Sequence, residues 1–377
     1  MKQFLIVALL AICGTLGSNK AAEAKDPTKG PAVQIALLLD TSNSMDGLID
    51  QAKSQLWSVV NEFIRARRDG RPARIEVALY EYGNDSLPSQ EGFVRMVLPM
   101  TDDLDAVSEK LFALKTNGGQ EYCGHVIRDA TGQLSWSGSD GVYKAIFIAG
   151  NEPFSQGTVD YHASCRAAIA KGIIVNTIFC GATSEGEQTG WRDGAVLADG
   201  RFICIDQERK VATILTPQDA EIARLGGALN KTYIPYGRMG RAGQARQVAQ
   251  DTNANNASPG AFVSRSISKG SSDLYCNDAW DLVDAIKTGK CKLDDVKDDD
   301  LPEDLRNLNL AERKSRVEKE TRGRESIQGH ILGLNKEREA YLASERKKLT
   351  EAGQETLDSA ILKAVREQAT RANIRFE

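Results

Sequence analysis

The chain has 377 residues and a formal net charge of −4, from 48 Lys and Arg against 52 Asp and Glu, so no excess of positive charge indicates a nucleic-acid ligand. Hydrophobic residues make up 41% and charged residues 27%, which is ordinary for globular proteins and excludes a wholly disordered chain. With only three histidines, His125, His162 and His330, a His-rich zinc site or a charge-relay triad is disfavoured.

The N-terminus, residues 1–24, is expected to be a secretion signal. Lys2 is followed by an apolar run from Phe4 to Ile12, and the Ala-Glu-Ala sequence at 22–24 predicts cleavage before Lys25. This run is too short for a transmembrane helix, and no later stretch has the required length. Because the signal resembles a bacterial one, we expect an exported protein, periplasmic or secreted, with no transmembrane segment in the mature chain.

Six cysteines remain once the expected signal is removed. An even number in an exported chain predicts disulfides, but sequence alone does not fix their pairing. Short loops make Cys180 with Cys204, and Cys276 with Cys291, plausible pairs, while buried free thiols are the alternative. The candidate disulfide residues are Cys123, Cys165, Cys180, Cys204, Cys276 and Cys291.

Between residues 31 and 250, buried apolar strands alternate with amphipathic helices. This alternation predicts an α/β domain with a doubly wound, mostly parallel sheet flanked by helices. The expected strands are 33–39, 75–82, 94–100, 143–149, 173–179 and 232–236. The expected helices are 48–63, 104–114, 123–134, 162–171 and 219–229.

After this domain the composition changes. Residues 251–260 are rich in Asn and Ala and predict a loop, within a linker that extends over 251–300. In this linker, 274–287 is expected to form a short helix flanked by the last two cysteines. The acidic run at 294–300 predicts a solvated hinge.

The remaining residues, 301–377, predict an α-helical appendage, either a helical hairpin or a coiled coil that binds a partner. Asn309 and Glu312 have the spacing of a capping box at the start of a long charged helix towards residue 349. A second helix is expected over 356–373. Its sparse apolar residues could pack against the first helix or against the sheet.

The candidate metal-binding residues lie at the end of the first expected strand. Asp40, Ser42 and Ser44 follow a buried run of leucines, in the turn before a helix. In an open parallel sheet, ligands bind beyond the carboxyl ends of the strands. A carboxylate and two hydroxyls are oxygen ligands suited to Mg²⁺, and an Asp or Glu from a partner could complete the shell.

These residues resemble the Asp-x-Ser-x-Ser motif that begins the metal-ion-dependent adhesion site (MIDAS) of von Willebrand factor type A (VWA) domains. The resemblance continues at 117–119, where the family often has Gly-Gly-Thr, and at 147–153, where it often has Thr-Asp-Gly-x-Pro. It covers about 31–237. It implies a non-enzymatic domain that binds a protein or cell-surface ligand, as in cell adhesion, through a bridging Mg²⁺, Mn²⁺ or Ca²⁺.

Two positions depart from the family pattern. The threonine ligand of the family is replaced by Gln120, which is followed by Glu121, and the expected aspartate is replaced by Gly150. The site is therefore incomplete by that pattern. Oxygen atoms of Gln120, Glu121, Asn151 and Glu152 are the candidate replacements.

Three alternatives stay open at this stage. Asp40 and the two serines could cap a helix without any metal, which would make the protein an exported scaffold with a degenerate site. A metal-assisted hydrolase has no recognisable general base. An aspartate-nucleophile phosphatase would need a second carboxylate where Ser42 stands. Apart from the metal site, Trp136, Trp191 and the polar stretch 183–199 are candidates for ligand recognition.

Overall fold

The structure is a computed structural model that describes residues 32–45, 49, 57, 60–205, 214–351 and 357–376. Residues from Pro31 onward form one unit. The expected secretion signal at 1–24 lies outside the described residues, and so does most of the helix expected over 48–63.

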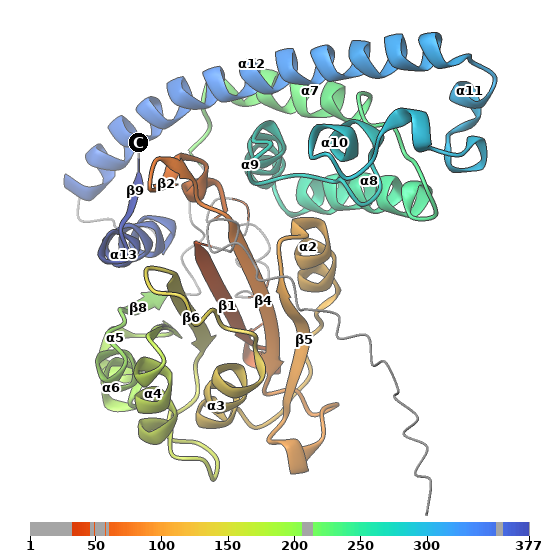
Figure 1. Ribbon diagram of the computed structural model, residues 1–377. Coiled ribbons are helices and arrows are strands. Elements are labelled where there is room, and N and C mark those ends of the chain that lie inside the picture. The colour runs from red at the N-terminus through yellow and green to blue at the C-terminus, as the bar shows by residue number, and fades with distance from the viewer. Residues whose placement is uncertain are drawn as a thin grey trace, which may run out of the picture. The chain divides into compact units, whose positions relative to one another are not determined.

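A six-stranded sheet forms the centre of this unit (Figure 1). Its order is β5-β4-β1-β6-β7-β8, and every neighbouring pair is parallel except β4 with β5. The predicted doubly wound, mostly parallel sheet is therefore confirmed. The strands are β1 (Val33–Asp40), β4 (Ile75–Tyr82), β5 (Val94–Thr101), β6 (Tyr143–Gly150), β7 (Ile173–Cys180) and β8 (Phe202–Ile205).

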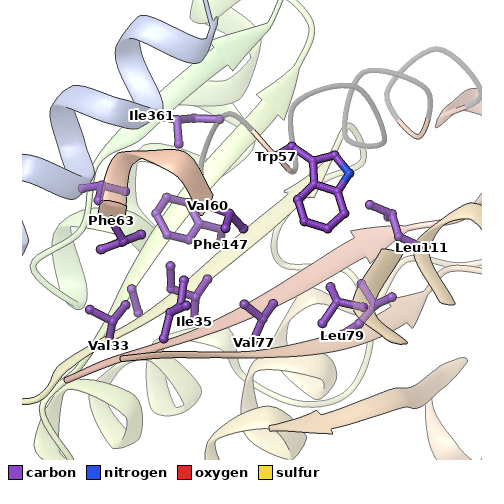
Figure 2. Packing of buried hydrophobic residues seen from close by; sticks show 14 of the residues in the cluster. Val33, Ile35, Trp57, Val60, Phe63, Val77, Leu79, Leu111, Phe147 and Ile361 are labelled. Atoms are coloured by element: carbon purple, nitrogen blue, oxygen red, sulfur yellow. The ribbon is translucent and has the colours of Figure 1, made fainter. Parts of the chain in front are cut away.

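Helices cover both faces of the sheet. Successive strand residues face opposite sides, so in β1 Val33 and Ile35 belong to one apolar cluster and Ala36 and Leu38 to the other. Figure 2 shows the first cluster, in which Trp57 lies above the strands. α2 packs in this cluster, and α3, α4 and α6 pack in the other. The helices are α2 (Leu104–Ala113), α3 (Cys123–Gln133), α4 (Tyr161–Ala170), α5 (Thr183–Gln188) and α6 (Trp191–Leu197).

The last helix of the chain, α13 (Leu357–Arg371), packs into the core of the sheet. Ile361 and Val365 belong to the same apolar cluster as β1. The buried amide of Gln368 donates to Asn176 Oδ1 at 2.7 Å and accepts from the Tyr143 hydroxyl at 2.8 Å. The segment 301–377, which we expected to be an appendage, thus contributes a helix to the sheet's own core. The sequence had left open whether this helix packs on the sheet or on its neighbour.

A group of helices lies between β8 and α13 in the sequence. They are α7 (Asp219–Asn230), α8 (Gly240–Ala257), α9 (Pro259–Gly270), α10 (Leu282–Lys287), α11 (Glu303–Arg306) and α12 (Leu310–Glu351). The prediction of a strand at 232–236 is wrong, because this segment forms only an isolated bridge between Pro235 and Asp281. Only the second half of the helix expected over 274–287 is helical.

The loop expected over 251–260 is also wrong. α8 continues to Ala257, and α9 begins at Pro259 after a single residue. The Ser258 hydroxyl caps α9 by accepting from the Ala261 N–H at 3.0 Å, and Pro is favoured in the first turn. The Asn- and Ala-rich composition therefore belongs to a helix that is anchored by other residues.

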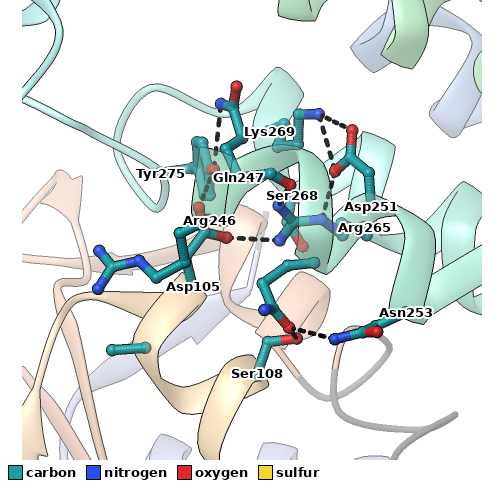
Figure 3. A network of polar contacts seen from close by, with 12 residues as sticks. Asp105, Ser108, Arg246, Gln247, Asp251, Asn253, Arg265, Ser268, Lys269 and Tyr275 are labelled. Atoms are coloured by element: carbon teal, nitrogen blue, oxygen red, sulfur yellow. Dashed lines mark hydrogen bonds and ion pairs between the residues drawn. The ribbon is translucent and has the colours of Figure 1, made fainter. Parts of the chain in front are cut away.

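Buried charges provide this anchorage (Figure 3). Arg265 of α9 has no exposed surface and pairs with Asp105 of α2 at 2.7 Å and Asp251 of α8 at 2.5 Å. Lys269, one turn later, also pairs with Asp251 at 2.8 Å. The Tyr275 hydroxyl donates to the second oxygen of Asp105 at 2.6 Å. The network joins α8 and α9 to α2, which packs on the sheet. We call the group of helices α7 to α12 the helical layer.

α12 begins as predicted. The N–H of Glu312 donates to Asn309 Oδ1 at 3.0 Å, and the N–H of Asn309 donates to the Glu312 carboxylate at 2.9 Å, which confirms the capping box. Its apolar residues Ile327 and Ile331 pack with α7 and α9. The acidic run 294–300 is exposed and forms two short 3₁₀ turns, from which Asp298 pairs with Arg313 of α12 at 2.8 Å.

A second, small sheet was not predicted. Its order is β3-β2-β9, with β2 (Ala66–Arg68), β3 (Arg71–Pro72) and β9 (Ile374–Phe376) all antiparallel. β9 follows α13, so the C-terminal segment pairs with a hairpin that precedes β4 (Figure 1).

The expected disulfides are not present. No disulfide joins any of the six cysteines outside the expected signal. Cys204 lies opposite Phe179 in the β7–β8 register, and its side chain packs with Phe179 on one face of the sheet, whereas Cys180 packs on the other face. A Cys180–Cys204 bond is incompatible with this register. The structure also leaves Cys276 and Cys291 unbonded.

Candidate metal site

The turn after β1 brings the three motif residues together. The Asp40 carboxylate accepts from the N–H of Ser42 at 2.7 Å. The hydroxyl oxygens of Ser42 and Ser44 are 2.9 Å apart, and Ser44 donates to Asn151 Oδ1, at the end of β6, at 3.1 Å. Asp40 and Ser42 are buried, whereas Ser44 is exposed. The row of oxygen atoms therefore runs from the buried end of β1 to the surface.

Glu121 adds a second carboxylate to this row. A Cβ atom at Gly83 would lie 2.7 Å from Asp40 Oδ1 and 2.6 Å from Glu121 Cγ, so both side chains converge on this glycine. Within the described part of the chain, Asp40 Oδ2 and Glu121 Oε2 are buried and have no hydrogen-bond partner. Buried carboxylate oxygens are normally satisfied. Two unsatisfied ones beside serine hydroxyls fit a hard divalent cation.

Both carboxylates have a raised proton affinity, chiefly because they are buried. Burial, and then the negative charge of Glu121, raises the pKa of Asp40 well above its usual value. Burial raises the pKa of Glu121 to about 7, and the charge of Glu152 adds to this, while a hydrogen bond from Ser42 lowers it. Without a cation, the pair is therefore expected to retain a proton near neutral pH.

This pKa shift predicts how stability depends on pH. Between the ordinary pKa of a glutamate, about 4.5, and about 7, the folded protein binds a proton that the unfolded chain has released. Its contribution to the free energy of unfolding is thus complete below the lower value and is lost as the pH rises through the upper one. Urea unfolding of chelator-treated protein should show lower stability at pH 7.5 than at pH 5, with part of the loss removed in Glu121→Gln. Equal pH dependence in both proteins would contradict the shift.

Two of the candidate replacement ligands, Gln120 and Glu152, are less well placed to bind a cation. Gln120 is exposed, and its side-chain carbonyl accepts from the Tyr122 hydroxyl. Glu152 is half-buried, and its charge acts on Glu121, but its backbone carbonyl is the group fixed by a hydrogen bond, from Trp191 Nε1 at 2.8 Å. We therefore place Gln120 outside the site and Glu152 at its edge.

The structure explains why β6 ends in glycine where an aspartate is expected. A Cβ at Gly150 would lie 2.5 Å from the Tyr82 hydroxyl and 3.0 Å from the ring of Trp191. Tyr82 is itself fixed by donating to the carbonyl of Ala149 at 2.9 Å. Two buried aromatic rings thus occupy the space that a side chain at this position would need. Because Trp191 is fully buried, it is not a ligand-recognition residue.

The sequence analysis did not identify Gly83. It follows β4, with a positive φ of 77°, and its backbone lies against Gly119, where a Cβ would be 2.2 Å from the carbonyl of Gly83. The sequence Gly-Asn-Asp directly after a buried strand could have indicated a turn at the same edge of the sheet.

The described residues contain no group of three or more His, Cys, Asp or Glu that could hold a metal. The site around Asp40 combines two carboxylates with hydroxyl and amide oxygens, a donor set that suits Mg²⁺, Mn²⁺ or Ca²⁺ better than zinc. Among the described helices, none is both long and apolar enough to cross a membrane.

No family model matches the sequence, and no curated protein does. Solved structures with a similar fold include BatB from Bacteroides thetaiotaomicron, at 19% identity over 46% of this chain and 90% of that one (TM-score 0.36). Proximal thread matrix protein 1 from the mussel byssus, whose MIDAS motif is occupied by zinc, is 14% identical over 48% of this chain and 43% of its own (TM-score 0.37). A von Willebrand factor type A protein from Catenulispora acidiphila is 15% identical over 48% and 40% (TM-score 0.35).

The strand order and the oxygen-rich turn at the carboxyl end of β1 define a doubly wound α/β domain with a site at the edge of its sheet. Asp40, Ser42 and Ser44 stand at that turn in the Asp-x-Ser-x-Ser pattern.

Proposed function

We propose that the protein is an exported, non-enzymatic binding protein whose VWA-type domain engages a protein or cell-surface ligand through a divalent cation. Asp40 and Glu121 supply carboxylates, Ser42 and Ser44 supply hydroxyls, and Asn151 supplies an amide oxygen. The cation is Mg²⁺, Mn²⁺ or Ca²⁺, and when bound it supplies a positive charge that can also accept an oxygen ligand from a partner.

One observation carries this proposal: two buried carboxylate oxygens, one from Asp40 and one from Glu121, have no hydrogen-bond partner among the described residues. Leaving such groups unsatisfied is costly, and both belong to side chains that meet at Gly83. A bound cation would satisfy both at once.

Access from solvent supports a role in binding. Ser44 is exposed and Asn151 is half-buried, so the outer end of the oxygen row is open to a partner. An Asp or Glu side chain from a protein or surface ligand is the simplest group to complete the shell, because hard cations prefer oxygen ligands. Export of the protein, to the periplasm or beyond, is part of this proposal.

Water proton relaxation of the Mn²⁺-loaded protein tests the proposal. Mn²⁺ with an open position should enhance relaxation through its bound water, and acetate should reduce the enhancement by replacing that water, whereas acetamide at equal concentration should not. Asp40→Ala should show no enhancement from bound Mn²⁺. Absence of Mn²⁺ binding by the wild-type protein would exclude the cation site. Binding that acetate leaves unchanged would exclude the carboxylate partner.

A further inference from the structure

The small sheet β3-β2-β9 concentrates positive charge in a protein whose net charge is negative. The hairpin and its flanks, together with the C-terminal strand and the turn before it, contain seven arginines and one aspartate, Asp69. We call this set the arginine sheet. Its arginines are Arg65, Arg67, Arg68, Arg71, Arg74, Arg371 and Arg375.

Like charges lie directly opposite one another in this sheet. Arg67 of β2 pairs in register with Arg375 of β9, and Arg68 of β2 pairs with Arg71 of β3. Like charges at directly opposed positions destabilise an antiparallel pair. The folded protein therefore maintains two repulsive cross-strand pairs within a sheet of three short strands, a cost that an anionic ligand would remove.

Four of these seven arginines have no carboxylate partner among the described residues. Arg74 pairs with Asp102 at 3.1 Å, and Arg68 approaches Asp69 at 4.0 Å. No carboxylate of a described residue pairs with the other exposed arginines of the sheet, which are Arg65, Arg71, Arg371 and Arg375. Elsewhere in the chain, arginines such as Arg265 are bonded to carboxylates.

The surface is polar as well as basic. The exposed large apolar side chains of the described residues all lie outside the arginine sheet: Val196, Leu215, Met239, Val248, Leu310 and Tyr341. Protein–protein interfaces usually have an apolar or aromatic centre, which is absent here. The features fit an extended array of phosphates, because the guanidinium group binds phosphate through two parallel hydrogen bonds.

The arginine sheet and the metal site lie at opposite edges of the main sheet. β3 immediately precedes the start of β4, whereas Asp40 ends β1, and β1 and β4 run parallel in register. Eight residues of strand span roughly 26 Å. A protein held by its arginine sheet would therefore present the candidate metal site on the side away from the attached surface.

We propose that the arginine sheet binds peripherally to membranes rich in anionic phospholipid. Export, expected from the N-terminus, would place the chain beside such a surface. Binding is electrostatic, without insertion of apolar side chains, so it weakens as salt screens the charges.

Cosedimentation with lipid vesicles tests this proposal. The full chain should sediment with vesicles of phosphatidylcholine that contain about one third phosphatidylglycerol, and not with phosphatidylcholine alone. Raising the salt from about 0.05 to about 0.5 M should release it. Arg71→Glu/Arg375→Glu should lower the affinity by at least about tenfold, since four units of charge are changed.

The matched control is Arg238→Glu/Arg241→Glu, which makes the same charge change at two exposed arginines outside the sheet and should bind like the wild type. The test variant should remain folded, because glutamate at 375 would face Arg67 across the strands. Equal loss in both variants, or none in either, would overturn the proposal. So would displacement by inorganic phosphate at matched ionic strength, which would indicate a free-phosphate site, or tighter binding to duplex DNA than to vesicles at equal phosphate.

Discussion

Replacing Arg265 with alanine should destabilise the protein by about 3–5 kcal/mol, the cost of removing one partner from a buried ion pair. The side chain has no exposed surface, pairs with Asp105 and Asp251, and lies over the ring of Trp57 at 4.7 Å. Its removal leaves the buried Asp105 carboxylate with the Tyr275 hydroxyl as its remaining partner in the network. The free energy of urea unfolding measures the effect.

Arg246→Ala is the matched control for this prediction. Arg246 lies on α8 in the same region and pairs with Asp103 at 2.5 Å, but both side chains are partly exposed. Exposed pairs contribute about 0–1 kcal/mol. If the two variants lost equal stability, the buried network would not be what holds the helical layer to α2.

Glu121→Gln should weaken cation binding at least about tenfold, whereas Gln120→Ala should leave it nearly unchanged. Glu121 supplies a buried carboxylate beside Asp40. Replacing this carboxylate by an amide removes one of the two negative charges that attract the cation. Gln120 is exposed to solvent, and its side-chain carbonyl accepts a hydrogen bond from the Tyr122 hydroxyl. Calorimetric titration of both variants with Mn²⁺ makes the comparison.

The reverse order of effects would assign the replacement ligand to Gln120, at the position of the family's threonine. It would also remove the basis for the pKa shift of Glu121. Asp102→Asn, which changes an exposed carboxylate outside the site, controls for the loss of one unit of charge.

Local patterns were sufficient to predict the motif and the parallel strands β1, β4, β6 and β7, whereas the short parallel strand β8 was not predicted. A short, largely apolar run such as 33–39 is typical of a strand in the middle of a sheet, and the polar residues after it then lie at the sheet's edge. The capping box at Asn309 and Glu312 is likewise a local signal, contained in four residues.

The helical layer could not be predicted in the same way, because partners distant in sequence determine it. The composition of residues 251–260 predicts a loop, yet Asp251 lies in a helix and is held by Arg265 and Lys269. The docking of α13 depends on Gln368, which bonds to Asn176 in β7. Such pairs, more than a hundred residues apart in the second case, leave no periodic signal in the sequence.

The candidate site was predictable in part. Asp40, Ser42 and Ser44 lie within one turn, so their spacing reveals them. The choice between Gln120 and Glu121 depended on which side chain the loop before α3 turns inward, and this is set by the close approach of Gly119 to Gly83. That approach joins two loops and cannot be read from either one.

Calorimetric titration of the chelator-treated protein with Mg²⁺ and Mn²⁺, beside Asp40→Ala, tests the central claim most directly. We predict saturable binding of one cation per chain at pH 7.5, and none in the variant, whose circular dichroism should match that of the wild type. Absence of binding by the wild-type protein, or equal binding by a folded Asp40→Ala variant, would show that the oxygen row at the end of β1 is not a cation site.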